Sequence, residues 1–160
     1  MIVAGIDPST YVGMVKTDGQ EHVGKAVNFP KLKGWQRLHS IANEVGRTLN
    51  LWNPDLVVIE GYAYGNTNSL VTLVEIGTLI RKIMYDLAIP WYDCPPTSLK
   101  KWVAGKGNAS KPVVGEFVLA RWGFKSPSDD IVDAFALAQL GVEIGQKGVT
   151  PGLRGVVRGW

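Results

Sequence analysis

The sequence has little cysteine and histidine and no long apolar run, and each shortage excludes a class of protein. Its single cysteine, Cys94, rules out an internal disulfide and fits a reducing cytoplasm. No apolar stretch approaches the length that spans a bilayer, and the N-terminus has no charged region followed by a signal core, so we expect no membrane partner. A glycine-rich phosphate loop with its lysine is also missing, which disfavours the commonest nucleotide hydrolases.

What remains is the composition of one globular domain. The chain has 160 residues, enough for one core and too few for two ordinary domains, with 46% hydrophobic and 19% charged residues. Its net charge of +3 says little about partners, but the cations gather between Pro95 and Lys125, where Glu116 is the one acid. We expect one folded domain over residues 1–146 and a mobile, glycine-rich basic tail over residues 147–160.

Apolar patterning predicts an α/β fold with five strands and five helices. Short runs rich in strand-forming residues predict strands at 2–6, 11–17, 21–29, 56–59 and 89–94. Helical spacing or capping signals predict helices at 35–52, 69–88, 97–103, 111–122 and from 129 onward. Thr97, Ser110 and the segment 126–129 are the expected helix caps. Asp18-Gly19 predicts a hairpin, whereas the helix at 35–52 is a crossover that sets the strand at 56–59 parallel to the first.

Four carboxylates stand at the edges of buried elements. Asp7 and Glu60 each follow a continuous apolar strand, so the two should meet at the carboxyl ends of neighbouring strands. Asp130 and Asp133 are three residues apart on one helix face. Any one of them alone is more often structural; an acid in the first turn of a helix, for example, favours the macrodipole. All four together favour a metal site.

The chemistry of these ligands points to hard cations. The donors are all oxygens, and His22 and His39 lie in other segments, so Mg²⁺ or Mn²⁺ is expected rather than zinc. Two such ions about 3.5–4 Å apart clamp the attacking and leaving oxygens of a phosphodiester. The lysine-rich span would pair with phosphates. The alternative for these lysines is the solvated surface of two short helices.

The expected helix at 69–88 is apolar almost all round. A helix of this kind is buried on more than one side. One side would pack on the sheet, and the other would pack either on another subunit or within the core of its own domain. We favour another subunit.

Four blocks of sequence, in this order, resemble the RuvC-type Holliday junction resolvases of the RNase H-like nuclease superfamily. The blocks are 5–8 (Gly-Ile-Asp-Pro), 57–60 (Val-Val-Ile-Glu), 96–111 (from Pro-Thr-Ser-Leu-Lys-Lys to Asn-Ala-Ser-Lys) and 130–138 (Asp-Ile-Val-Asp-Ala-Phe-Ala-Leu-Ala). The short length and glycine-rich tail are similar to bacteriophage members of the family. The resemblance implies a mixed five-stranded sheet flanked by helices, located in the bacterial cytoplasm or, for a phage protein, in that of the infected cell.

The resemblance further implies a homodimer that binds a four-way DNA junction and nicks two strands symmetrically, with two Mg²⁺ or Mn²⁺ ions in each active site. The helix after the second acid would form the dimer contact. The residues that would bind metal and catalyse are Asp7, Glu60, Asp130 and Asp133, and Lys111 would assist catalysis. The residues that would contact DNA are Lys100, Lys101, Lys106, Lys111, Tyr62, Tyr64 and Asn66. The family's wedging aromatic corresponds to Ala63, so either neighbouring tyrosine is a candidate for that role.

Three other interpretations stay open. An RNase H-like nuclease for other branched DNA or for RNA-containing substrates would use the same acids. A sugar-kinase or actin-like ATPase also opens with Gly-Ile-Asp and a hairpin, but 160 residues leave no room for its two lobes. A non-catalytic DNA-binding module would have no need of four acids.

Overall fold

Six strands form one mixed sheet in the computed structural model, which describes residues 1–62, 67–149 and 155–159. The strands are β1 (Val3–Asp7), β2 (Val12–Thr17), β3 (His22–Val27), β4 (Leu56–Glu60), β5 (Trp91–Cys94) and β6 (Val157–Arg158). They lie in the order β3-β2-β1-β4-β5-β6. β1 pairs parallel with β4 and β4 with β5, whereas the β1–β2, β2–β3 and β5–β6 pairs are antiparallel. The mixed sheet confirms the expected fold class, but the expectation of five strands was wrong by one.

The sixth strand comes from the expected tail. Val157 and Arg158 pair with Asp93 and Tyr92 of β5, and the neighbouring Val156 is buried. Residues 155–159 of the expected tail thus lie against the sheet, and the mobility of the tail stays a prediction. Two residues are too few to leave a periodic pattern in the sequence, which explains why this strand was missed. A division of the chain at residue 146 stays a prediction.

Within the part of the chain that the structure describes, five helices flank the sheet, close to the predicted positions. They are α1 (Gly34–Trp52), α2 (Thr67–Asp86), α3 (Pro96–Ala104), α4 (Lys111–Trp122) and α5 (Asp129–Lys147). The expected caps differ, because α3 begins after Pro95 rather than at Thr97, and neither Ser110 nor Ser128 makes a side-chain capping hydrogen bond. Across the described ranges, no helix is long and apolar enough to cross a membrane.

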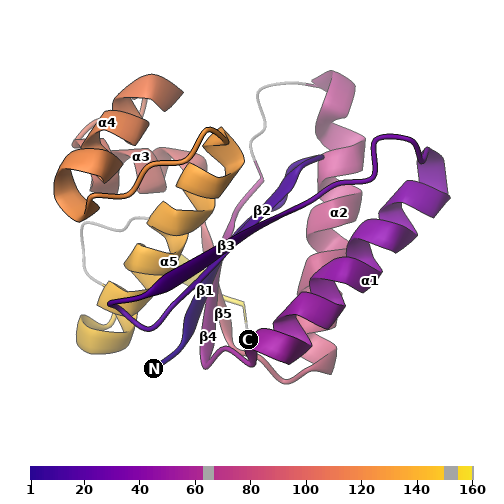
Figure 1. The fold of residues 1–160 in the computed structure, drawn as a ribbon. Helices are drawn as coiled ribbons and strands as arrows, with labels where there is room; N and C mark the ends of the chain where they lie inside the picture. The colour runs from indigo at the N-terminus through magenta and orange to yellow at the C-terminus, as the bar shows by residue number, and fades with distance from the viewer. Residues whose placement is uncertain (63–66, 150–154, 160) are drawn as a thin grey trace.

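The elements form three layers, with α1 and α2 on one face of the sheet and α5 with α3 and α4 on the other (Figure 1). Alternate residues of the central strands enter two separate cores. Ala4 and Ile6 of β1 pack toward α1 and α2, whereas Val58 of β4 packs toward α5. Burial on both faces accounts for the uninterrupted apolar runs in β1 and β4.

Candidate active site

The register of the parallel strands brings Asp7 and Glu60 together. Ile6 of β1 lies opposite Ile59 of β4, so the next residue of each strand leaves the sheet at the same edge. Only 5% of Asp7 is exposed, and Glu60 is half-buried. The prediction that these two acids meet at the carboxyl ends of neighbouring strands is thus met by the geometry.

Helix α5 carries Asp130 and Asp133 over the same edge, because glycines let it rest on the backbone of the sheet. A Cβ atom at Gly13 of β2 would lie 2.1 Å from the carbonyl oxygen of Asp130, and one at Gly5 of β1 would lie 2.0 Å from that of Ala134. The patterns in the sequence predict no structural role for these glycines. A glycine inside an apolar strand does indicate close approach of another backbone, so the signal was present.

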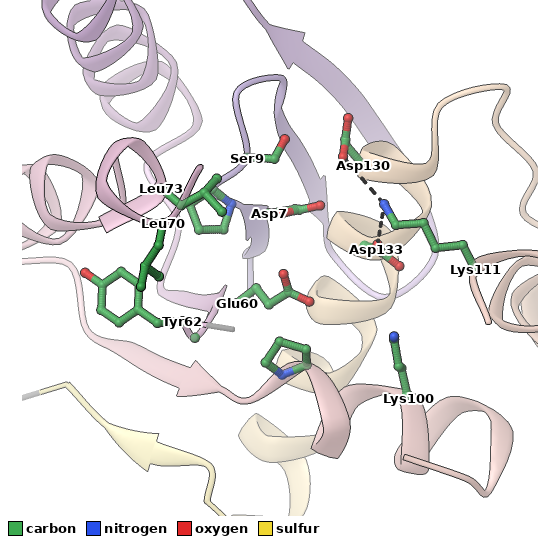
Figure 2. A pocket seen from close by; sticks show the side chains of 13 residues that line it. Asp7, Ser9, Glu60, Tyr62, Leu70, Leu73, Lys100, Lys111, Asp130 and Asp133 are labelled. Atoms are coloured by element: carbon green, nitrogen blue, oxygen red, sulfur yellow. Dashed lines mark ion pairs between the residues drawn. The ribbon is translucent and has the colours of Figure 1, made fainter. Parts of the chain in front are cut away.

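The four acids line one open cleft of about 230 Å³. Figure 2 shows Lys100 and Lys111 on one side of it and Tyr62 with two leucines of α2 on the other. The lining residues are Asp7, Pro8, Ser9, Glu60, Gly61, Tyr62, Leu70, Leu73, Pro96, Lys100, Lys111, Asp130 and Asp133. The cleft therefore has a charged wall beside an apolar one.

Burial and mutual repulsion make these carboxylates hard to ionise. Burial, followed by the negative charges of Glu60, Asp133 and Asp130, raises the pKa of Asp7 to about 9. Burial and the charge of Asp133 raise the pKa of Glu60 to about 7, although Lys111 and Lys100 oppose the shift. Burial also raises the pKa of Asp133 above its ordinary value, despite Lys111. The cleft thus favours added positive charge.

Lys111, in the first turn of α4, supplies part of that charge. Its Nζ lies 3.7 Å from Oδ2 of Asp133 and 3.9 Å from Oδ1 of Asp130. Partial burial acts to lower the pKa of Lys111, but the attraction of Asp133, Asp130 and Asp7 outweighs it, and the pKa is raised. Half of the side chain remains exposed, so the ammonium group is accessible from solvent.

The other predicted DNA contacts are distributed differently. Lys100 lines the cleft, whereas Lys101 and Lys106 are exposed and do not line it. Tyr64 and Asn66 lie outside the described residues. Tyr62 lines the cleft, and its hydroxyl is 3.1 Å from the hydroxyl of Thr78 on α2.

The acids do not converge on one point. Among the residues that the structure describes, no three His, Cys, Asp or Glu side chains are grouped so that they could hold a metal ion. Anionic carboxylates repel one another unless a cation or proton lies between them. Binding of a cation would require these side chains to turn toward it within the cleft.

Cys94 lies beside the cleft but takes no part in it. It pairs with Glu60 in the β4–β5 register and is fully buried. Burial, together with the charge of Glu60, raises the pKa of the Cys94 thiol to about 12. A thiol that stays protonated is neither a nucleophile nor a metal ligand near neutral pH.

Comparison with known proteins finds similarity over nearly the whole chain. Residues 3–140 match the family model of the crossover junction endodeoxyribonuclease RuvC. The RuvC of Chlamydia trachomatis is 30% identical over 151 residues, covering 86% of this chain and 88% of that protein. The RuvC of Prochlorococcus marinus is 26% identical over 153 residues, covering 89% of this chain and 98% of that protein. Among solved structures, Thermus thermophilus RuvC in complex with Holliday junction substrate has the same fold, with a TM-score of 0.77 and 24% identity over 92% of this chain and 96% of that one. The similarity to bacteriophage members stays a prediction.

Proposed function

The chain belongs to the RuvC family of crossover junction endodeoxyribonucleases, and we propose that it resolves Holliday junctions by phosphodiester hydrolysis in the cleft of Asp7, Glu60, Asp130 and Asp133. One observation carries the assignment of the site. Three elements, β1, β4 and α5, bring four carboxylates to one cleft that two lysines also line. Paired nicks, one in each of two strands, are the reaction that resolves such a junction.

The donor set fits divalent cations. Carboxylate oxygens are the ligands that Mg²⁺ and Mn²⁺ prefer. Burial and the neighbouring acids raise the pKa values of Asp7 and Glu60, and a bound cation would offset both effects. We propose that the four acids hold two such ions. When bound, the ions would polarise the phosphodiester and make water a stronger nucleophile.

The protein's own side chains orient the substrate. Lys100 and Lys111 face the acids across the cleft, where they would attract the scissile phosphate and offset the charge that develops on it. Lys101 and Lys106, both exposed within the basic span 95–125, would contact flanking phosphates and contribute salt-dependent affinity. The apolar wall of Tyr62, Leu70 and Leu73 would pack against the adjacent nucleotide and exclude bulk water from that side.

Two active sites are needed for paired nicks, and α2 offers a surface for a second copy. Its inner face buries Ile76, Ile80 and Met84, whereas 69% of Val71 and 38% of Val74 are exposed. Burial of exposed apolar side chains is favourable, so this outer face is the proposed homodimer contact. Leu70 and Leu73 of the same helix line the cleft, so each cleft of the dimer would lie close to the interface.

Replacement of Asp7 by asparagine tests the site. Asp7→Asn removes a metal-binding carboxylate and leaves the lysines in place, so junction cleavage should be lost while junction binding persists. Cleavage is measured with labelled four-way junctions, and binding by gel shift in the presence of chelator. Asp18→Asn, in the exposed turn between β2 and β3, is the matched control and should cleave normally. Cleavage by Asp7→Asn at the wild-type rate would remove this cleft from the reaction.

A further inference from the structure

Arg81 of α2 contacts four residues, and two of them, Glu60 and Tyr62, line the cleft. We infer that Arg81, held by Asp93 of β5, is a positioning residue that fixes the end of β4 at Glu60 and the aromatic wall at Tyr62. The inference rests on the proposed function, because it concerns the geometry of the same hydrolytic site. The sequence alone predicts no role for Arg81 or Asp93.

The anchor of this arrangement is an ion pair between α2 and the sheet. Arg81 donates from Nε to Oδ1 of Asp93 at 2.8 Å, and its Nη2 also contacts that oxygen. The other carboxylate oxygen, Oδ2, lies 3.3 Å from the indole nitrogen of Trp91, which is buried. With 16% of the Arg81 side chain and 25% of the Asp93 side chain exposed, solvent screens the pair less than it screens a surface pair.

The rest of the guanidinium reaches the segment that contains Glu60. Nη2 makes a long contact of 3.4 Å to the carbonyl oxygen of Glu60, and Nη1 donates to the carbonyl of Gly77 at 2.9 Å. On the other side of Glu60, the backbone N–H of Gly61 donates to the carbonyl of Cys94 at 2.8 Å. The main chain at Glu60 is therefore fastened both to β5 and to α2.

Tyr62 is held by the same group. The guanidinium carbon of Arg81 lies 4.7 Å from the centre of the Tyr62 ring, and Nη1 lies 3.3 Å from the Tyr62 hydroxyl. The fit is close, because a Cβ atom at Gly77 would lie 3.0 Å from Cε1 of Tyr62 and 2.8 Å from Nη1 of Arg81. Tyr62 is thus packed against α2 as part of the cleft wall.

Only arginine can make all of these contacts. Its planar guanidinium presents five N–H donors in fixed directions and also stacks on an aromatic ring. A lysine could pair with Asp93, but its single ammonium could not reach the two carbonyls and the Tyr62 ring at once. Removing Arg81 should free Glu60 and Tyr62 to move while leaving Lys100 and Lys111 in place to bind DNA.

The test compares Arg81→Met, Arg81→Lys and Asp93→Asn with the control Arg47→Met. Arg47 pairs with Glu44 on the exposed surface of α1 and makes none of the contacts described above. Single-turnover cleavage of a four-way junction is measured with saturating protein over a series of Mg²⁺ concentrations, and junction affinity is measured in chelator. Because a displacement of about 1 Å at a reacting centre costs about a hundredfold in rate, we expect Arg81→Met to slow cleavage about 10- to 100-fold, with unchanged junction affinity and a higher Mg²⁺ requirement.

Further outcomes separate positioning from general destabilisation. Asp93→Asn should slow cleavage in the same way, and the double variant should be no slower than Arg81→Met, because the two residues act as a unit. Arg81→Lys should fall between the wild type and Arg81→Met, and it keeps the test open if Arg81→Met does not fold. Wild-type cleavage by folded Arg81→Met or Arg81→Lys would overturn the inference, as would a defect confined to junction affinity. Failure of the proposed function itself would be seen separately, as cleavage by Asp7→Asn.

Discussion

Gly13 offers a sharp test of how the fold assembles the site, because α5 rests on it. In Gly13→Ala the new Cβ atom would lie 2.1 Å from the carbonyl oxygen of Asp130 and 3.2 Å from its Cβ atom. An ordinary contact needs about 3.4 Å, so the start of α5 must withdraw by about 1 Å. Such overpacking costs about 1–3 kcal/mol of stability, and a displacement of about 1 Å at the carboxylates should slow cleavage about a hundredfold.

The assay pairs urea unfolding with single-turnover cleavage of a four-way junction. Gly46→Ala is the matched control, since its Cβ atom would meet Ile83 of α2 at 3.6 Å, an ordinary contact on the opposite face of the sheet. Because Gly46 lies within helix α1, where alanine is favoured over glycine, this control should cleave normally. Its free energy of unfolding should be higher than that of the wild type by about 0.5–1 kcal/mol. The reasoning is refuted if Gly13→Ala unfolds and cleaves like the wild type.

Three further predictions concern the charges and surfaces of the site. Because the pKa of Asp7 is raised from 3.8 to about 9, the folded state retains a proton that the unfolded state releases, so metal-free protein should lose stability as pH rises from about 5 to 8. Asp7→Asn should flatten this slope in thermal unfolding with chelator, and a wild-type stability that rises with pH would contradict the assignment. Lys111→Ala should slow single-turnover cleavage about a hundredfold, and an unchanged rate would place its ammonium outside the reaction. The double change Val71→Glu with Val74→Glu should yield monomers in sedimentation, whereas the exposed control Leu51→Glu should not; a dimeric double variant would exclude this face of α2 as the contact.

The sequence was most informative where one physical pattern dominates. Continuous apolar runs ending in Asp7 and Glu60 predict buried parallel strands that deliver carboxylates to one edge, and the register of β1 and β4 agrees. The three-residue spacing of Asp130 and Asp133 predicts one helix face, and α5 provides it. These features depend on local composition and on the short-range geometry of strands and helices.

What the sequence did not reveal depends on contacts between distant segments. The pairing of Val157 with Asp93 joins residues far apart in the chain and involves a strand of two residues. The contacts of Arg81 with Asp93 and Tyr62 likewise join α2, β5 and the end of β4, and no spacing within one element encodes them. The helix caps failed for a different reason, since Ser110 and Ser128 occupy the expected positions without making the side-chain bond that defines a cap.

The central claim is that this cleft makes metal-dependent, paired nicks in four-way junctions. It is tested most directly by a nicking assay on a mobile four-way junction beside linear duplex, single-stranded DNA and an RNA–DNA hybrid, each with Mg²⁺, Mn²⁺ or chelator. We predict symmetric nicks in two strands of the junction, present with either metal and absent with chelator. Preferential cutting of the hybrid, equal cutting of every substrate, or junction binding without cutting under any metal would contradict the claim.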